Sequence, residues 1–152
     1  MIKTQIEKDP ELDQPDDEIC CKILRTVLED QDIDDGTITV IFGQDELLRG
    51  LKKQFFQKNQ FTDVIAFRLN NYKEKAVEGE VYISLPRARE NAEIFGEPFE
   101  KEVTRLLIHG VLHLLGFDDI TKISKKEMTS LEDTYLTMVR WKKLFTKKIS
   151  SL

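Results

Sequence analysis

The stretch Arg105–Asp119 reads RLLIHGVLHLLGFDD, and its pattern indicates which helix lies at the centre of the fold. Apart from His109 and His113, its interior consists of apolar residues and glycine. Such a stretch is typical of a helix buried at the centre of a domain, because an exposed helix carries a broad polar face. Gly116 can adopt the left-handed conformation that ends a helix. The sequence therefore predicts a central buried helix over about 98–115.

The segments before this helix alternate between helical and strand patterns. Apolar residues at four-residue spacing predict a helix from Asp16 to about Glu29, and alternation predicts a strand over 37–42. The next predicted segments are a helix over 47–55, strands over 61–69 and 80–85 that pair as a hairpin, and a short helix over 86–95. Residues 1–15 are polar and contain two prolines, so a flexible N-terminal segment is expected there.

The last helix is predicted to begin at Ser124, because Ser124 and Glu127 match the S-x-x-E capping box. Its expected buried stripe is Met128, Leu131, Tyr135 and Met138, extended by Trp141 and Phe145. The order of elements predicts an α+β fold. In this fold, helices cover a small mixed β-sheet, and the helix that carries the histidine pair lies buried at the centre.

The length of 152 residues fits a single domain, which we expect to span residues 16–152. The net charge of −5 is unevenly spread: residues 1–36 carry 12 acidic and four basic side chains, whereas residues 120–152 carry three acidic and eight basic ones. This balance argues against a general nucleic-acid coat. No apolar run is long enough to span a membrane, and the adjacent Cys20 and Cys21 are expected as reduced thiols, which favours a cytoplasmic location.

His109 and His113 are the only histidines of the chain. On a helix, their four-residue spacing places both imidazoles on nearly the same face. Buried imidazoles need polar partners, because an unsatisfied buried polar group costs about 1–3 kcal/mol. A shared metal ion would satisfy both rings, and two hydrogen-bonded core histidines are the alternative.

Two aspartates follow the histidine helix directly. Gly116 lets the chain turn back toward the histidine face, which would bring Asp118 and Asp119 there. Three protein ligands with one open position describe a catalytic zinc site, so the sequence predicts the ligand set His109, His113 and Asp119. Asp118 is the alternative third ligand. It could instead cap the turn, or orient a ligand histidine through a hydrogen bond without contacting the metal.

The segment HGVLHLLGFDD at 109–119 resembles the signature H-G-x-L-H-L-x-G-[YF]-D-H of the YbeY family of metal-dependent endoribonucleases. Three further stretches are similar to family segments: FEKE at 99–102, TDV at 62–64 and GEVYIS at 79–84. The resemblance covers roughly residues 37–140 and therefore most of the expected domain.

The resemblance implies an endoribonuclease that cleaves single-stranded RNA with the help of a bound metal ion. The implied substrate is precursor ribosomal RNA near the 3′ end of the 16S rRNA. The implied partner is the ribosome or its small subunit, in rRNA maturation and ribosome quality control. One Zn²⁺ per chain is the implied cofactor, with His109, His113 and Asp119 as its ligands. No residue is assigned as a catalytic acid or base.

Two departures from the family pattern predict a weaker enzyme. The family signature ends in a histidine where this chain has Asp119, a harder and negatively charged ligand. The family also carries a functionally important arginine where this chain has Phe56, and Arg49, Lys52 or Lys53 could supply the lost cation. The C-terminal cations could guide RNA, although a solvated helix face is the simpler interpretation: Arg140, Lys142, Lys143, Lys147 and Lys148.

Two other functions compete with this interpretation. A metalloprotease of the H-E-x-x-H type needs a glutamate directly after the first histidine, and Gly110 stands there instead. A non-catalytic, ribosome-associated metal-binding factor is the main alternative, because the replaced ligand and the missing arginine both weaken the prediction of turnover. Trp141 and the phenylalanines are expected in the core rather than on a surface that stacks bases.

Overall fold

The computed structural model describes residues 1–145, and a four-stranded sheet forms its centre. Its strands are β1 (Ile2–Lys8), β2 (Gly36–Gly43), β3 (Val64–Arg68) and β4 (Val77–Ser84). They lie in the order β1-β2-β4-β3, with β1, β2 and β4 parallel and β3 antiparallel to β4. The sheet is therefore mixed, and the β3–β4 hairpin expected from the sequence forms its far edge.

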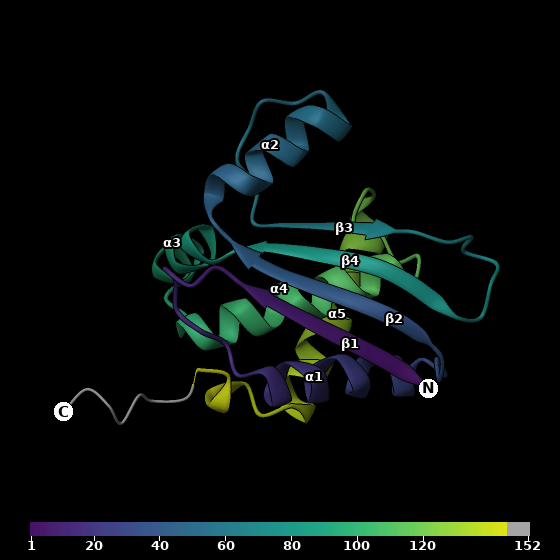
Figure 1. Ribbon diagram of the computed structural model, residues 1–152. Coiled ribbons are helices and arrows are strands. Elements are labelled where there is room, and N and C mark those ends of the chain that lie inside the picture. Colours follow the sequence, from purple (N-terminus) through teal and green to yellow (C-terminus); the bar gives the residue numbers. More distant parts are fainter. Residues whose placement is uncertain (146–152) are drawn as a thin grey trace.

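Five α-helices and one short 3₁₀ helix accompany the sheet within residues 1–145. They are α1 (Asp17–Asp30), α2 (Asp45–Phe56), α3 (Leu85–Phe95), α4 (Phe99–Leu114), α5 (Lys122–Met138) and η1 (Trp141–Lys143). Figure 1 shows α1, α4 and α5 on one side of the sheet, whereas α2 projects beyond the β3 edge. Within this described part of the chain, no helix combines the length and apolarity needed to cross a bilayer.

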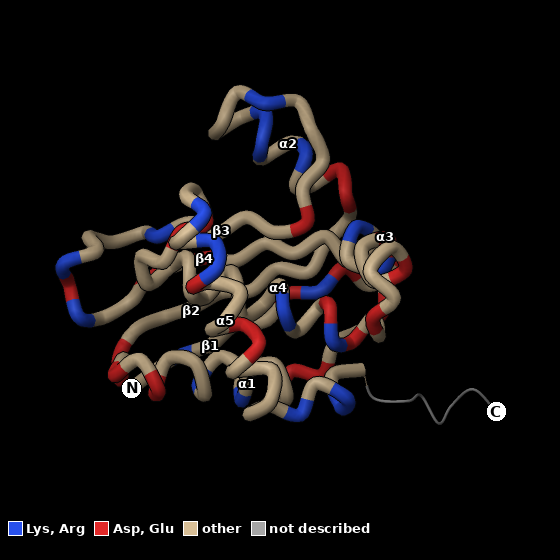
Figure 2. Tube along the Cα trace, turned by 180° about the vertical axis from the view of Figure 1, so that it is seen from behind, with Lys and Arg blue, Asp and Glu red and all other residues tan. Residues whose placement is uncertain are grey.

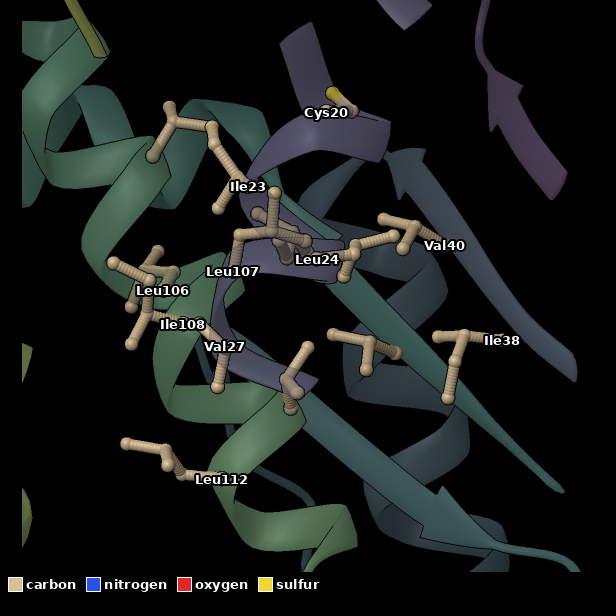
Figure 3. Packing of buried hydrophobic residues seen from close by; sticks show 14 of the residues in the cluster. Cys20, Ile23, Leu24, Val27, Ile38, Val40, Leu106, Leu107, Ile108 and Leu112 are labelled. Carbon is tan, nitrogen blue, oxygen red and sulfur yellow. The ribbon is translucent and has the colours of Figure 1, made fainter. Parts of the chain in front are cut away.

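The core lies between the sheet and the pair α1 and α4. Side chains alternate along β2, so that Ile38 and Val40 are fully buried while their neighbours are half-buried. Figure 3 shows Leu24 of α1 and Leu107 of α4 meeting this inner face of the sheet. Burial of apolar surface at about 25 cal/mol per Å² makes this layer the main source of stability. The predicted α+β fold with a central buried histidine helix is confirmed.

The N-terminal residues differ from the sequence expectation of a flexible segment over 1–15. Ile2–Lys8 form β1, which pairs in parallel with β2 from Ile2 opposite Gly36 to Lys8 opposite Phe42. Ile2 is buried on the inner face, and Thr4 Oγ1 lies 2.8 Å from Cys21 Sγ of α1. Only Ile2 and Ile6 are apolar on the inward face of this edge strand, where Thr4 and Lys8 occupy the other positions, and the partner strand lies far away in sequence. The polar composition of residues 1–15 therefore gave no strand pattern from which β1 could be predicted.

The last helix begins earlier than predicted and also ends earlier. Its N-cap is Thr121, whose Oγ1 accepts a hydrogen bond from the Ser124 N–H at 3.0 Å. Ser124 Oγ in turn accepts one from the Thr121 N–H at 3.0 Å, so the capping box joins Thr121 and Ser124, not Ser124 and Glu127. The helix stops at Met138, which is 51% exposed, and Trp141 belongs to η1. The chain turns at Val139, so the predicted buried stripe does not continue along one helix to Trp141 and Phe145.

Candidate functional site

A glycine sets the distance between the histidine helix and the sheet. A Cβ atom added to Gly110 would lie 2.5 Å from Cγ1 of Val81 in β4, so only glycine permits this approach. The helix ends at Leu114, and Gly116 has the left-handed φ of +101° that the sequence predicted. The ring centroids of His109 and His113 are 5.8 Å apart, as expected for one turn of helix.

A buried carboxylate of α5 orients His109. Glu132 is 6% exposed, and its Oε2 lies 2.6 Å from His109 Nδ1. Its Oε1 accepts a hydrogen bond from Arg105 Nη1 at 2.9 Å. Because a carboxylate only accepts hydrogen bonds, His109 Nδ1 carries the hydrogen, and Nε2 of the neutral ring has its lone pair free for another partner.

Sequence reasoning missed Glu132, although a signal was present. Glu132 lies four residues after Met128 and three before Tyr135, so it falls on the buried face of α5. An acidic residue within an apolar stripe needs a buried partner. That partner, His109, lies 23 residues away in the sequence and could be identified only once α4 and α5 were packed together.

The turn after α4 brings one of the two aspartates to the histidines. Asp119 Oδ2 lies 3.8 Å from His109 Nε2, and Asp119 lines the same pocket as His109 and His113. Asp118 instead accepts a hydrogen bond from the Ile120 N–H at 3.1 Å, and the hydrogen bonds of its side chain with Ser124 and this N–H lower its pKa. Asp118 therefore caps the turn, which is one of the two other roles named for it above.

The pocket around the histidines has a volume of about 290 Å³ and lies between α4, α2 and β3. Its lining residues are Lys52, Phe56, Thr62, Asp63, Val64, Ile65, Ala66, His109, Gly110, His113 and Asp119. Asp63 accepts a hydrogen bond from Asn91 Nδ2 at 2.9 Å, and the same amide nitrogen lies 3.4 Å from Glu102 Oε2. This network anchors the segment before β3 to α3 and α4.

The two histidines have opposite electrostatic environments. Burial by itself lowers the pKa of His109, but the hydrogen bond and charge of Glu132, together with the charges of Asp119 and Asp63, outweigh it and raise that pKa. Burial and the neighbouring His109 lower the pKa of His113. His113 is therefore held in its neutral form, which is the form that binds a metal ion.

The imidazole nitrogens and the carboxylate oxygens of this pocket are atom types that bind a divalent ion. The distance between His109 Nε2 and Asp119 Oδ2 is larger than in a site with the ion bound. Zinc bound to nitrogen and oxygen at about 2.0–2.2 Å keeps two ligand atoms roughly 3.4 Å apart, compared with 3.8 Å between His109 Nε2 and Asp119 Oδ2. Among residues 1–145, no group of three or more His, Cys, Asp or Glu side chains is arranged to hold an ion. Binding would therefore draw Asp119 closer to His109.

Of the three cations considered as replacements for the family arginine, Lys52 lines the pocket. Its Nζ lies 4.9 Å from the centroid of the Phe56 ring. Arg49 donates a hydrogen bond to Asn59 at 2.8 Å, outside the pocket lining. Arg140 lines a separate pocket beside α1, and Lys147 and Lys148 lie outside the described residues.

The chain is similar in sequence to proteins that share the name endoribonuclease YbeY. The sequence profile of the endoribonuclease YbeY family matches residues 2–140. Endoribonuclease YbeY of Chloroherpeton thalassium is 38% identical over 115 residues, which are 76% of this chain and 80% of the relative. The protein of the same name from Chlorobaculum tepidum is 35% identical over 125 residues, which are 82% of this chain and 90% of the relative.

A solved structure has a similar fold. The solution structure of a protein from Thermotoga maritima has a TM-score of 0.59 and 28% sequence identity to this chain. The superposition covers 90% of this chain and 87% of the other protein. The similarity therefore extends over the sheet and the helices that form the histidine pocket.

Proposed function

This chain belongs to the endoribonuclease YbeY family, and from that membership we propose that it cleaves single-stranded precursor ribosomal RNA at the histidine pocket with a bound zinc ion. The activity class is that of the family, an endoribonuclease and hence a hydrolase that acts on RNA. The family membership predicted from HGVLHLLGFDD is thereby confirmed. The metal, the ligand set and the ribosomal substrate are the parts that we propose.

The observation that carries this proposal is the bond between His109 and Glu132. The buried carboxylate holds His109 Nδ1 at 2.6 Å, which leaves Nε2 on the side of the ring where Asp119 lies. Metal-binding histidines are typically oriented by such a carboxylate. We propose one zinc ion per chain, with His109, His113 and Asp119 as ligands and one position open. A divalent ion held by these residues would lower the pKa of bound water and offset negative charge on a phosphate.

Lys52 is the residue proposed to face the scissile phosphate. It lines the pocket together with the histidines, whereas the position of the family arginine is occupied by Phe56. A lysine ammonium attracts phosphate as a point charge but lacks the bidentate geometry of arginine. The charge of Asp119 also offsets part of the positive charge of the ion. Turnover is therefore expected to be slower than in a relative with the full pattern, because losing one preorganised contact costs about 10²–10³-fold.

The proposed substrate is precursor rRNA of the small subunit near its 3′ end, and the proposed partner is the ribosome or that subunit. Family membership supports this assignment. Adjacent cysteines such as Cys20 and Cys21 are expected as reduced thiols, and we propose a cytoplasmic location for the reaction.

Metal analysis of the purified protein tests the ligand set. We expect about one zinc ion per chain, and the ion should be lost in His109→Ala and in His113→Ala, because two remaining ligands rarely hold zinc tightly. Asp118→Ala is the matched control for Asp119→Ala, since the two carboxylates are adjacent but only Asp119 lines the pocket. Retention of zinc in the double histidine variant would refute the site. Loss in Asp118→Ala, with retention in Asp119→Ala, would exchange the third ligand.

Cleavage of a labelled single-stranded RNA tests the activity. We expect slow cleavage that is abolished by EDTA and by His113→Ala and is restored to the wild-type protein by zinc. At saturating RNA, Phe56→Arg and Asp119→His should each raise the rate, and their combination should not be additive because both act on one transition state. If neither the wild-type chain nor the double variant cleaves RNA with zinc bound, the protein is the non-catalytic ribosome-associated factor.

A further inference from the structure

The segment from α2 into the following loop has an unusual composition. Residues 47–61 contain four basic residues, three phenylalanines and no acidic residue, in a chain whose net charge is −5. Figure 2 shows the Lys and Arg positions gathered along α2 and the loop, on the part of the chain that projects from the body. A local positive potential on an acidic protein attracts negatively charged partners.

The three phenylalanines of this segment are exposed. Phe55 is 54%, Phe56 is 42% and Phe61 is 43% exposed, which contradicts their expected place in the core. Phe55 and Phe56 both contact Phe67 of β3, with ring centroids at 5.3 Å and 6.1 Å. This contact holds the two rings in fixed orientations. Exposed large rings that are held in place are typical of a binding surface.

Cations accompany two of these rings. Lys52 Nζ lies 4.9 Å from the Phe56 centroid, and the guanidinium of Arg49 lies 5.0 Å from the Phe61 centroid. Single-stranded nucleic acids bind to surfaces of this type, because each nucleotide offers a flat base to a ring and a negative phosphate to a cation. A protein partner would offer no such regular pairing of flat rings and negative charges.

The surface is continuous with the histidine pocket. Phe56 and Lys52 line that pocket together with His109, His113 and Asp119. A strand that stacked on Phe56 would therefore place its adjoining phosphate beside the histidines. The replacement of the family arginine by Phe56 then changes the type of contact at this position from charge to stacking.

We propose that Arg49, Lys52, Phe55, Phe56 and Phe61 form a stacking platform for single-stranded RNA. The exposed rings stack on bases, and the cations contact the flanking phosphates. The platform feeds the strand into the histidine pocket and binds it with little sequence preference, because every base has a flat face. The choice of RNA as ligand rests on the proposed function.

Binding of an abasic strand tests the platform without any variant. The wild-type protein is held in EDTA, so that no cleavage occurs, and the fluorescence anisotropy of a labelled oligoribonucleotide is compared with that of an abasic strand of equal length. Both strands carry the same phosphates. We expect the abasic strand to bind at least about 5-fold more weakly, because stacking contributes strongly for each base. Equal affinity for the two strands would overturn the proposal.

A pair of matched substitutions locates the effect. Phe55→Leu and Phe56→Leu keep apolar bulk against Phe67 but remove the flat ring, and each should weaken binding of the normal strand by about 5-fold or more. Tyr72→Leu is the control, because Tyr72 is 57% exposed and also has a cation over its ring, that of Arg68 at 4.9 Å, but lies outside the platform. An equal loss in Tyr72→Leu, or no loss in the Phe variants, would overturn the platform.

The failure of the platform and the failure of the proposed function give different results. Tight binding in EDTA that depends on Phe55 and Phe56, without cleavage when zinc is added, would refute the catalytic proposal and retain the platform. Zinc-dependent cleavage, together with RNA affinity that is unchanged in both Phe variants, would refute the platform and retain the catalytic proposal.

Discussion

Glu132 shows how a single buried charge can organise a site. Its carboxylate accepts from His109 on one oxygen and from Arg105 on the other, so it joins α5 to α4. Arg105 also reaches Asp133, the next residue of α5, at 2.6 Å. Glu132 therefore couples the orientation of His109 to the packing of the two helices.

At this scale we predict that Glu132→Gln weakens zinc binding by about 10–100-fold, because a partner of a metal-binding histidine has been changed. Competition with a chromogenic chelator measures the affinity. Asp133→Asn is the matched control, since it removes the exposed partner of Arg105 and leaves His109 untouched. If Asp133→Asn weakens zinc binding equally, Glu132 does not act through His109.

Glu102 of α4 is 5% exposed, and burial raises the pKa of its carboxyl group although Asn91 opposes the shift with a hydrogen bond. The folded state then binds this proton more tightly than the unfolded chain. Stability from this group is therefore fully present at acidic pH and is lost as the pH rises through the raised pKa.

We predict that Glu102→Gln increases the free energy of unfolding at neutral pH. The gain should vanish well below pH about 4, where the wild-type carboxyl group is protonated in both states. Urea titrations at the two pH values measure the difference. Glu93→Gln on the exposed surface of α3 serves as the control and should show no such pH-dependent gain.

At the scale of elements, the contact between α4 and β4 decides where the histidines lie. We predict that Gly110→Ala lowers the free energy of unfolding by about 1–3 kcal/mol, the usual cost of overpacking, because the new Cβ would meet Val81 at 2.5 Å. Urea unfolding measures the loss.

Gly50→Ala on α2 makes the same chemical change at a position where the added methyl group has space, so the effect on stability should have the opposite sign. Nothing lies within 4 Å of a Cβ added at Gly50, so helix propensity should stabilise the protein by up to about 1 kcal/mol. A similar effect of the two substitutions would show that the approach of α4 to the sheet does not depend on glycine.

At the scale of the whole molecule, β1 completes the sheet on which α1 packs. We predict that removal of residues 1–8 lowers the free energy of unfolding by about 2 kcal/mol or more, because the buried Ile2 and the backbone pairing with β2 are lost. Equilibrium unfolding in urea measures this change. Lys3→Thr, Gln5→Thr and Glu7→Thr, on the exposed face of β1, should each alter stability by no more than about 0.5 kcal/mol. An unchanged midpoint after truncation would mean that the strand contributes nothing to the fold.

Much of the fold and part of the site follow from local patterns. The apolar run around His109 and His113 predicts the buried helix, Gly116 predicts its end, and the spacing of the histidines predicts their shared face. Each of these properties depends on residues within a few positions of one another. The backbone geometry of a helix or a tight turn is set by such neighbours, so it can be predicted from the order of residues alone.

The contacts between distant segments depend on how the whole chain packs. The pairing of β1 with β2, the bond of Glu132 to His109 and the exposure of Phe55 and Phe56 all depend on how separate elements meet. A buried polar group or an edge strand signals that it needs a partner, but the choice of partner follows from packing across the whole core. A phenylalanine is likewise buried only if another element covers it, and α2 projects beyond the sheet, where its rings stay exposed.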